Sequence, residues 1–479
     1  MIKVSKFDDV YLTVDTDPSI SQELSDYLTF TVPGAQFMPQ VRNRFWDGKI
    51  RLYNQMKKQL YFGLGPKIED FCRSRNYELI VKDDPAFFQQ EFSLNEVDDL
   101  AKNIGLSLEP RDYQKRAISH AIRNKRCMLL SPTASGKSLI IYMLSRYYPE
   151  RKLIIVPTTA LVHQMSSDFK EYGYQDECHK ITAGADKDTD AEITVTTWQS
   201  IYKMPKSWFN QYNVVIGDEA HLFKSKSLES IMKKLTVCPY RFGFTGTLDG
   251  TLTHRLVLEG LFGPVEKVTT TSELIESNHL AKFKINIITL KYSDQTCNLL
   301  RRAKYQDEID FLVRNEARNR FIRNLCISLE GNTLVLFNFV DKHGKVLYNM
   351  INDENTKTAF YVHGGVDGEE RDRIRSIVEE SQNAVIVASY GTFSTGVNIR
   401  NLHNIIFASP SKSRVRNLQS IGRGLRTAEG KTEARLFDIV DDLRHKQWKN
   451  YALEHFTERL KIYNEEKFPY KMYSVRLKE

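Results

Sequence analysis

The residues best suited to phosphate chemistry lie in the stretch Ser131-Pro132-Thr133-Ala134-Ser135-Gly136-Lys137-Ser138. This stretch follows an apolar run and opens a helix-like segment, a context in which backbone N–H groups and a helix N-terminus can hold phosphates. We expect Lys137 to contact the β- and γ-phosphates of ATP and Ser138 to ligate Mg²⁺. Because the pattern GxxxxGK[ST] has glycine where Ser131 stands, the loop alone leaves open an ordinary Gly-Lys-Ser turn. The residues expected to contact the nucleotide here are Thr133, Ala134, Ser135, Gly136, Lys137 and Ser138.

A pair of acidic residues, Asp218 and Glu219, ends a second apolar run and is followed by Ala220 and His221. Open α/β sheets bind their ligands at the carboxyl ends of the strands. Asp218 is therefore predicted to be a second Mg²⁺ ligand, and Glu219 to orient or deprotonate the attacking water. Taken alone, the pair also fits a solvated strand end, but the loop upstream favours the catalytic interpretation.

A segment that mixes arginine with glycine, Gln419-Ser420-Ile421-Gly422-Arg423-Gly424-Leu425-Arg426, lies far downstream. Its two arginines are three positions apart, so on a helix or tight turn they face the same way. Guanidinium groups at the γ-phosphate stabilise transition-state charge, an effect worth roughly 10³–10⁵ in rate. The alternative is a basic surface helix, which the two glycines disfavour. The predicted catalytic residues are thus Lys137, Asp218, Glu219, Gln419, Arg423 and Arg426.

Two sets of short apolar runs must position these residues. Such runs, alternating with helical stretches, favour strands that are buried on both faces of a parallel sheet, and they predict two successive α/β domains. The first set comprises residues 127–131, 153–157, 193–197, 213–218 and 241–246, and the second comprises 283–290, 333–337, 359–364, 384–389, 404–409 and 434–440.

The N-terminal segment has a different pattern. Residues 10–15 and 49–54 favour strands, whereas residues 21–30 and 65–77 favour helices. We expect a small α+β module that is separate from the α/β domains. The predicted domains are residues 1–95 for this DNA-binding module, 96–275 and 276–440 for the two α/β domains, and 441–479 for a helical tail.

The composition fits a globular protein of two or three domains, with 479 residues, of which 41% are apolar and 27% charged. The net charge of +8 is compatible with a phosphate-backbone partner, although it is weak evidence alone. None of the six cysteines lies in a CxxC pair, so neither a zinc site nor a redox motif is expected. Since neither a signal peptide nor an 18-residue apolar run occurs, we expect a cytoplasmic protein with no membrane partner.

Taken in order, eight motifs resemble those of superfamily 2 helicases. The resemblance covers roughly residues 105–440 and implies two tandem RecA-like domains that share one ATP site. It also implies that Gln114 reads the adenine and that Gly396 and Asn398 contact the nucleotide, although the family usually has Asp at position 398. The motifs are RDYQ (111–114), PTTALVHQ (157–164), TTWQS (196–200), DEAH (218–221), TGT (245–247), LVLFNFV (334–340), SYGTFSTGVNI (389–399) and QSIGRGLR (419–426).

The same resemblance implies a groove along which one nucleic-acid strand lies. Hydroxyls, amides and backbone N–H groups suit such a groove because they position a strand without reading its bases. For each threonine, local capping or strand packing is the alternative. Thr245 and Thr247 would couple ATP hydrolysis to movement along the strand. The implied backbone contacts are Thr158, Thr197, Gln199 and Thr395.

A basic stretch in the N-terminal module supplies further candidate DNA contacts. Residues 40–60 contain six Lys or Arg residues against one acid, Asp47. Cations among aromatic residues fit duplex or branch-point binding. Alternatively, Phe45 and Trp46 fill the small core of a hairpin, which is the favoured interpretation for Trp46. The candidate contacts are Arg42, Arg44, Lys49 and Arg51.

The segments FMPQVRNRFWDGKIRLYN (37–54) and YFGLGPKIEDFC (61–72) are similar to the N-terminal domain of the phage UvsW helicases. This resemblance implies an ATP-dependent DNA helicase that uses Mg²⁺ and acts on Holliday junctions, replication forks and R-loops in recombination, repair and recombination-dependent replication. The implied partners are branched, duplex and single-stranded DNA; RNA in RNA–DNA hybrids and recombination or single-strand-binding proteins are further candidates. The implied compartment is the host cytoplasm. An RNA helicase on the same motor stays open, as does a nonenzymatic DNA-binding scaffold, which the intact catalytic set disfavours.

Overall fold

A computed structural model describes residues 1–82, 84–248, 250–396, 399–409, 411, 413–427 and 431–478, without the side chains of residues 253, 394–396, 414, 415 and 423. The chain divides into two compact units. The first comprises Met1–Ser131 and Gly136–Val268, and the second comprises Pro132–Ser135 and Thr269–Glu479.

The N-terminal region folds around a five-stranded sheet made of β1 (Ile2–Lys6), β2 (Tyr11–Thr16), β5 (Tyr53–Asn54), β6 (Gln59–Tyr61) and β7 (Leu79–Val81). The strand order is β5-β6-β2-β1-β7, in which β1 pairs antiparallel with β2 and parallel with β7. With it pack α1 (Pro18–Tyr27), η2 (Phe62–Leu64) and α3 (Gly65–Arg75). These elements make the region α+β, as predicted.

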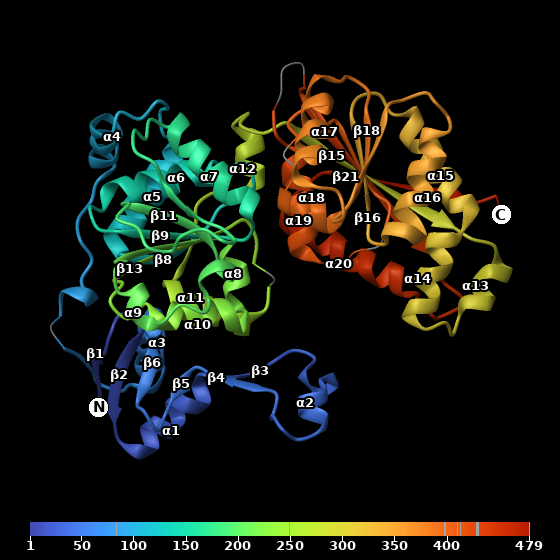
Figure 1. The fold of residues 1–479 in the computed structure, drawn as a ribbon. Helices are drawn as coiled ribbons and strands as arrows, with labels where there is room; N and C mark the ends of the chain where they lie inside the picture. Colours follow the sequence, from blue (N-terminus) through green and yellow to red (C-terminus); the bar gives the residue numbers. More distant parts are fainter. Residues whose placement is uncertain are drawn as a thin grey trace. The chain divides into compact units, whose positions relative to one another are not determined.

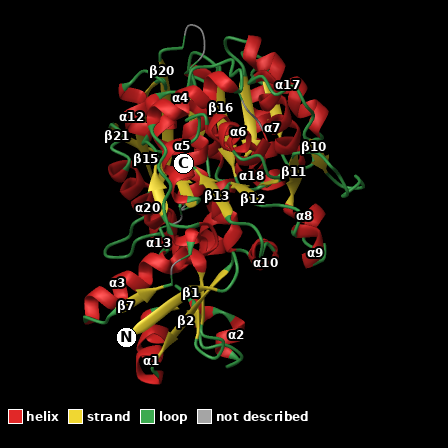
Figure 2. Ribbon diagram, turned by 90° about the vertical axis from the view of Figure 1, so that its left-hand side faces the viewer, coloured by secondary structure: helices red, strands yellow, loops and turns green. Residues whose placement is uncertain are grey.

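A separate hairpin extends from this sheet, as Figure 1 shows, whereas Figure 2 shows β1, β2 and β7 of the sheet with α1 and α3 beside them. It consists of β3 (Thr29–Thr31) and β4 (Lys49–Arg51), which pair antiparallel, with η1 (Ala35–Phe37) and α2 (Pro39–Arg42) between them. We call residues 29–51 the arm. The prediction of one strand over residues 49–54 is wrong, because the chain passes at Leu52 from the arm to the main sheet and makes two short strands, β4 and β5.

The first α/β domain contains a seven-stranded sheet in which every pairing is parallel. The strands, in spatial order, are β10 (His179–Ile181), β11 (Ile193–Thr197), β9 (Lys152–Val156), β12 (Val214–Asp218), β13 (Tyr240–Thr245), β8 (Arg126–Leu130) and β14 (Val265–Lys267). The helices are α5 (Asp112–Asn124), α6 (Lys137–Tyr147), α7 (Thr159–Glu171), α8 (Trp198–Ile201), α9 (Lys206–Phe209), η4 (Ala220–Lys224), α10 (Lys226–Lys234) and α11 (Leu252–Phe262), preceded by η3 (Pro85–Phe87) and α4 (Leu94–Asn103).

The core of the N-terminal region is continuous with that of the first α/β domain. One apolar cluster joins residues of β1, β2 and α3 to residues of β9, β12, α10 and α11. Across this junction the guanidinium of Arg126 donates to the backbone carbonyl of Asp9 at 2.8 Å and lies 4.1 Å from the ring centre of Phe62. The hydroxyl of Tyr61 donates to Glu229 at 2.6 Å. The N-terminal region therefore folds as part of the first unit.

The second unit also contains a seven-stranded sheet with only parallel pairings, so the predicted α/β fold with two RecA-like domains is confirmed. Its strands, in spatial order, are β17 (Ala359–Val362), β18 (Val385–Ser389), β16 (Thr333–Phe337), β19 (Asn404–Phe407), β20 (Glu433–Asp442), β15 (Lys282–Lys291) and β21 (Tyr470–Arg476). Its helices are α12 (Thr271–Glu276), α13 (Asp294–Leu300), α14 (Tyr305–Arg314), α15 (Glu316–Ser328), η5 (Val340–Gly344), α16 (Lys345–Asn352), α17 (Gly368–Glu380), α18 (Tyr390–Gly396), α19 (Arg414–Gly424) and α20 (Tyr451–Glu465).

The C-terminal segment is part of the second unit and is not wholly helical. α20 is a helix, and its Arg459 pairs with the buried Asp438 of β20 at 2.8 Å. The expectation of a helical tail is wrong for Tyr470–Arg476, which forms strand β21 beside β15. Most of β21 is exposed, so its sequence lacks the apolar alternation that marks a half-buried strand.

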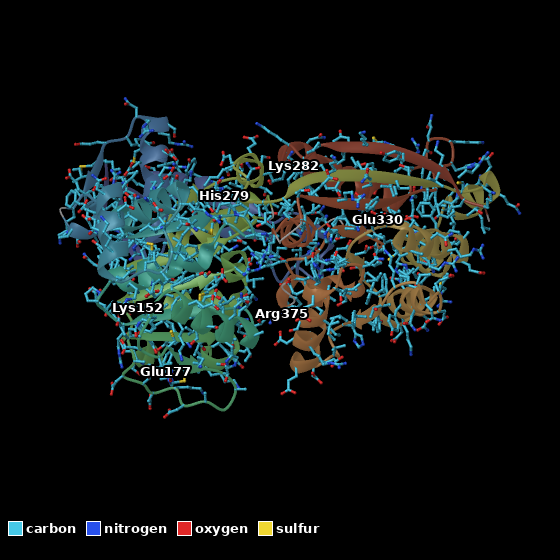
Figure 3. All side chains as sticks on the ribbon, turned by 90° about the horizontal axis from the view of Figure 1, so that it is seen from above. Lys152, Glu177, His279, Lys282, Glu330 and Arg375 are labelled. Atoms are coloured by element: carbon cyan, nitrogen blue, oxygen red, sulfur yellow. The ribbon has the colours of Figure 1, made fainter. Side chains whose placement is uncertain are left out.

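Side chains fill the space between sheet and helices in each α/β domain (Figure 3). Lys152, labelled there, is a fully buried lysine on β9 whose ammonium pairs with Glu192. All six cysteines are free and buried. Among the described residues, no helix has the length and apolarity needed to cross a membrane.

Candidate active site

The phosphate loop begins directly after β8 and ends where α6 begins at Lys137. The backbone N–H of Ser131 donates to the carbonyl of Thr245 at 2.9 Å, which joins the start of the loop to the end of β13. Ala134 and Gly136 have φ values of 67° and 77°, so the loop turns through two left-handed positions. Ser131 is fully buried and is not among the described residues with positive φ. Its position therefore needs a small side chain but not glycine, which explains the departure from the loop pattern.

Lys137 and Gln114 both contact the loop. The ammonium of Lys137 donates to the carbonyl of Ser131 at 3.4 Å, a long and weak hydrogen bond. Gln114 is buried on α5; its amide oxygen accepts from the backbone N–H of Arg111 at 2.9 Å, and its amide nitrogen donates to the carbonyl of Gly136 at 3.3 Å. A Cβ atom on Gly136 would lie 2.4 Å from that nitrogen, so the close approach of Gln114 requires glycine. The amide predicted to read adenine thus lies against the loop.

The register of three neighbouring strands gathers the loop and the acid pair at one edge of the first α/β sheet. β13 lies between β12 and β8, with Asp218 opposite Phe244 and Thr245 opposite Leu130. Thr245 therefore stands between the two motifs. Its carbonyl holds the loop, and its hydroxyl lies 3.0 Å from Nδ1 of His221.

The acid pair is held in a strained turn. Glu219 has a φ of 50°, which is uncommon for a residue other than glycine, and its backbone N–H donates to a carboxylate oxygen of Asp218 at 2.9 Å. The Glu219 carboxylate lies 3.3 Å from Nδ1 of His221. The two carboxylates therefore have different partners, the backbone N–H of Glu219 for Asp218 and the ring of His221 for Glu219.

The surroundings of Asp218 fit a divalent cation. Desolvation by the protein and the negative charge of Glu219 raise the pKa of Asp218 to about 6, although the charge of Lys137 opposes this shift. An added cation would compensate this carboxylate charge. No cluster of three or more His, Cys, Asp or Glu side chains that could hold a metal occurs within the described ranges. The two predicted donors, the Asp218 carboxylate and the Ser138 hydroxyl, suit Mg²⁺, because this ion binds one or two protein oxygens together with water and phosphate oxygens.

Ser138, the other predicted magnesium ligand, has a partner that the sequence did not indicate. Its hydroxyl lies 2.8 Å from the hydroxyl of Tyr172, which follows α7. Burial raises the pKa of Tyr172, so this phenol remains protonated near neutral pH. Ser138 would have to exchange this hydrogen bond for a metal contact. No local sequence pattern indicates this contact, because Ser138 and Tyr172 are 34 positions apart.

Three of the predicted backbone contacts lie in the first unit. β11 and β9 are neighbours, and Thr197 is opposite Val156, so Thr197 and Thr158 follow the same sheet edge. The Thr158 hydroxyl accepts from the backbone N–H of Leu161 at 3.4 Å, and the Thr197 hydroxyl lies 3.1 Å from that of Ser200. Both hydroxyls thus make local contacts, as the alternative interpretation expected, whereas Gln199 on α8 is exposed.

In the second unit, α18 and α19 carry the downstream motifs. Asn398 lies outside the described residues, as do the side chains of Thr395 and Arg423 and the surroundings of Gly396. Gln419 lies on α19, and Arg426 follows its end. A buried lysine that the sequence analysis missed, Lys431, donates to the carbonyls of Gly424 at 2.6 Å, Arg426 at 2.7 Å and Arg400 at 2.9 Å. Lys431 therefore holds the end of α19 and the backbone at Arg426 in place.

The predicted DNA-binding cations all lie on the arm. Arg42 ends α2, Arg44 follows it, and Lys49 and Arg51 lie on β4. Arg51 is paired with Asp47 at 2.5 Å, whereas Arg42, Arg44 and Lys49 make no ion pair with any described carboxylate. The guanidinium of Arg51 and the backbone N–H of Lys49 hold the pKa of Asp47 below its usual range.

The arm also decides between the interpretations of its two aromatic residues. Trp46 is partly buried, and its indole N–H donates to the carbonyl of Lys49 at 2.9 Å, so it braces the hairpin. Phe45 is 85% exposed. The alternative of a hairpin core is therefore wrong for Phe45 and supported for Trp46.

The parallel sheets, the phosphate loop and the acid pair define a class of protein, the superfamily 2 helicases. Three family descriptions match the chain: "DNA helicase UvsW, N-terminal" over residues 1–82, "Type III restriction enzyme, res subunit" over 107–250, and "Helicase conserved C-terminal domain" over 316–428.

The chain is 37% identical to the ATP-dependent DNA helicase uvsW of Enterobacteria phage T4, over 99% of this chain and 100% of that protein. It belongs to the UvsW family. The crystal structure of T4 UvsW matches with a TM-score of 0.52 at 35% identity and covers 99% of both chains. A more distant relative, the DNA 3'-5' translocase XPB2 of Sulfurisphaera tokodaii, is 25% identical over 70% of this chain and 82% of its own length.

Proposed function

We propose that this chain is an ATP-dependent DNA helicase that moves on branched DNA in recombination, repair and recombination-dependent replication. Its substrates are Holliday junctions, replication forks and R-loops. Family membership supports the helicase activity, since the T4 relative carries the name ATP-dependent DNA helicase. The basic, aromatic arm supports the preference for branched DNA.

The single observation that carries the proposal is the convergence of the loop, Asp218 and Thr245 at one sheet edge. Loop N–H groups and Lys137 bind the phosphates, Gln114 binds the adenine, and Glu219 positions the attacking water. Ser138 and Asp218 would hold Mg²⁺, which would supply positive charge to neutralise the transferred group. The proposal includes phosphate contacts from Gln419, Arg423 and Arg426, and nucleotide contacts from Gly396 and Asn398.

We further propose that Thr158, Thr197, Gln199 and Thr395 contact the strand on which the motor moves. For Thr158 and Thr197, backbone N–H groups are the better donors, because their hydroxyls already have local partners. The hydrogen bond between His221 and Thr245 connects the acid pair to the segment that ends at Thr247. This connection couples ATP hydrolysis to the residues that contact the nucleic-acid strand. We also propose that this chain acts in the host cytoplasm. Its further proposed partners are RNA–DNA hybrids and recombination or single-strand-binding proteins.

A substrate panel tests this function. ATP hydrolysis is measured with forked DNA, a four-way junction, linear duplex, single-stranded DNA and structured RNA, and strand separation is measured on the same forks. Forked and four-way DNA should stimulate hydrolysis most strongly, since they present both a duplex and a branch. Stimulation by RNA alone would reverse the choice in favour of an RNA helicase. Absence of any nucleic-acid stimulation would remove the motor assignment.

Neutralising the unpaired arm cations should weaken binding to forked DNA and flatten its salt dependence. Each lost phosphate contact removes about 0.9 from the slope of log K against log salt, so Arg42→Gln/Arg44→Gln/Lys49→Gln should reduce the slope by about 2–3. Arg51 is left intact because its removal would also unpair Asp47. Fluorescence anisotropy at several salt concentrations measures the slope.

A matched control is Lys57→Gln, which removes an exposed cation from the turn between β5 and β6. It should change the slope by less than about one unit. If the triple variant keeps the full slope, the arm cations serve the structure of the hairpin alone.

A further inference from the structure

The arm displays two phenylalanines that no part of the described chain covers. Phe37 is 77% exposed at the end of η1, and Phe45 is 85% exposed just after α2. Phenylalanine is among the residues that gain most from burial, so two exposed rings only eight positions apart indicate a contact surface.

The arm holds these rings on an ordered backbone. The backbone N–H of Phe45 donates to the carbonyl of Gln40 at 2.9 Å, and that of Val32 donates to the carbonyl of Gly48 at 2.8 Å. Gly48 has a φ of 76°, and a Cβ atom there would lie 2.9 Å from the Cβ of Ala35. Close packing across the hairpin therefore fixes the segment from which both phenylalanines project.

The base of the arm is joined to the first unit. The Thr29 hydroxyl donates to the carbonyl of Ser25 at 2.6 Å, and the backbone N–H of Leu52 donates to the carbonyl of Leu28 at 3.0 Å. Phe30 and Ile50 pack against the apolar cluster that the N-terminal region shares with the first α/β domain. The arm is thus attached to the first unit, which contains β8, the strand that precedes the phosphate loop.

The charges around Phe37 and Phe45 indicate which kind of ligand this surface binds. The arm contains four cations and one acid, and that acid, Asp47, is paired with Arg51. Arg42 and Arg44 lie between Phe37 and Phe45 in the sequence and are exposed. Apolar rings among uncompensated cations fit a ligand that offers both flat, apolar faces and regularly spaced negative charge. Nucleic acid combines nucleobases and phosphates in this way.

We infer that Phe37 and Phe45 form an aromatic wedge that stacks on unpaired or terminal bases where the strands of branched DNA separate. This inference rests on the proposed function and assigns the branch point to the tip of the arm. Apolar side chains inserted at base steps unstack them in other complexes, and aromatic rings stack on any base without reading its sequence. Arg42, Arg44 and Lys49 bind the flanking phosphates, so the arm recognises the shape of a branch.

The test uses forked DNA with 2-aminopurine placed at the branch point or ten pairs inside the duplex. Wild-type protein should raise the fluorescence only at the branch, because only there are bases unstacked. Phe37→Ala/Phe45→Ala should lose this rise and bind the fork about tenfold more weakly, in line with the loss of base stacking. Its ATP hydrolysis with single-stranded DNA should remain within about twofold of wild type.

Two comparison variants separate stacking from general effects. Met56→Ala removes an exposed apolar side chain, 97% accessible, from the same N-terminal region outside the arm, and should behave as wild type. Phe37→Leu/Phe45→Leu keeps apolar bulk without a ring and should bind the fork more weakly than wild type, whereas Phe37→Trp/Phe45→Trp keeps the rings and should bind it as tightly as wild type. Thermal unfolding is measured for every variant, and an unchanged transition shows that the fold is intact.

The outcomes are distinct from those that test the proposed function. If wild-type hydrolysis responds to no DNA, the motor assignment fails. If wild type unwinds forks and the alanine variant gives the same branch fluorescence, the wedge is overturned and the motor stands. If instead the alanine variant converts a wild-type dimer to a monomer in sedimentation, the rings are a contact between copies of this chain, which also overturns the wedge.

Discussion

Lys137→Ala should reduce DNA-stimulated ATP hydrolysis by at least about 10²–10³-fold, because it removes the cation that we propose stabilises charge on the β- and γ-phosphates. Lys137 begins α6, so it lies at the helix N-terminus that directly follows the loop. Its hydrogen bond to Ser131 is 3.4 Å long, and exchanging it for a phosphate contact costs little.

The same substitution should disturb the acid pair. The charge of Lys137 lowers the pKa of Asp218 against the effects of desolvation and Glu219. Without that charge the pKa of Asp218 rises further, so at a given pH more of this carboxyl is protonated and unable to bind a cation. Hydrolysis by Lys137→Ala should therefore require more Mg²⁺ than hydrolysis by wild type, measured as residual activity over a magnesium titration.

A matched control is Lys170→Ala on α7 of the same domain. Lys170 is 54% exposed and pairs with the exposed Glu177, so its loss should leave hydrolysis unchanged and stability within about 0.5 kcal/mol. Binding of forked DNA without nucleotide should be retained by both variants, which shows that Lys137→Ala is folded. Full DNA-stimulated hydrolysis by Lys137→Ala would contradict the assignment of the loop as the ATP site.

Much of the fold was predictable because its strands carry local signals. β8, β12 and β16 are continuous apolar runs, which a strand buried on both faces requires. The short strand β10 and the exposed β21 carry too little apolar periodicity to be recognised, and their places are set by the edges of existing sheets.

The candidate site was predictable where its chemistry resides in short motifs and not where it depends on distant contacts. The loop and Asp218 follow predictable strands, so their convergence follows from the parallel order. The partnership of Ser138 with Tyr172, 34 positions away, is a tertiary contact that leaves no pattern in sequence. Lys431 is only seven positions from Gly424, but no sequence motif marks its hydrogen bond to that carbonyl. The exposure of Phe45 likewise depends on how a hairpin closes, which alternation alone does not determine.

The continuity between the N-terminal region and the first α/β domain was also not predictable, since it depends on pairs far apart in sequence. Asp9 and Arg126 are 117 positions apart, and Tyr61 and Glu229 are 168 apart. Two glycines interlock at this junction. A Cβ atom on Gly63 would lie 2.0 Å from the carbonyl oxygen of Glu259, and one on Gly260 would lie 3.0 Å from Tyr61.

Gly63→Ala should therefore separate the N-terminal region from α11 and destabilise the first unit. The added methyl meets backbone atoms of Glu259, Gly260 and Gly263, which cannot move aside by changing a rotamer. Overpacking of this kind costs about 3 kcal/mol or more. For a unit of this size the unfolding temperature should fall by roughly 6–12 °C, which calorimetry measures.

The control is Gly65→Ala, two residues away at the start of α3. Its Cβ atom would meet only Leu12 Cδ1 at 3.7 Å, an ordinary contact, and the helical φ of −46° suits alanine. This variant should be neutral or slightly more stable, because alanine restricts the unfolded chain. Limited proteolysis between β7 and α4 should be accelerated in Gly63→Ala and unchanged in Gly65→Ala.

The effect of Gly63→Ala on fork unwinding shows whether the junction between the N-terminal region and the first α/β domain must be rigid. If the arm must keep a fixed place on the first unit, Gly63→Ala at a temperature where both domains remain folded should lose fork unwinding more than hydrolysis stimulated by single-stranded DNA. The phosphate loop and His221, which contacts Glu219, are outside the junction and keep their hydrogen bonds to Thr245. Equal unfolding temperatures and equal unwinding for the two glycine variants would mean that the N-terminal region acts as an independent module and that the shared core contributes little.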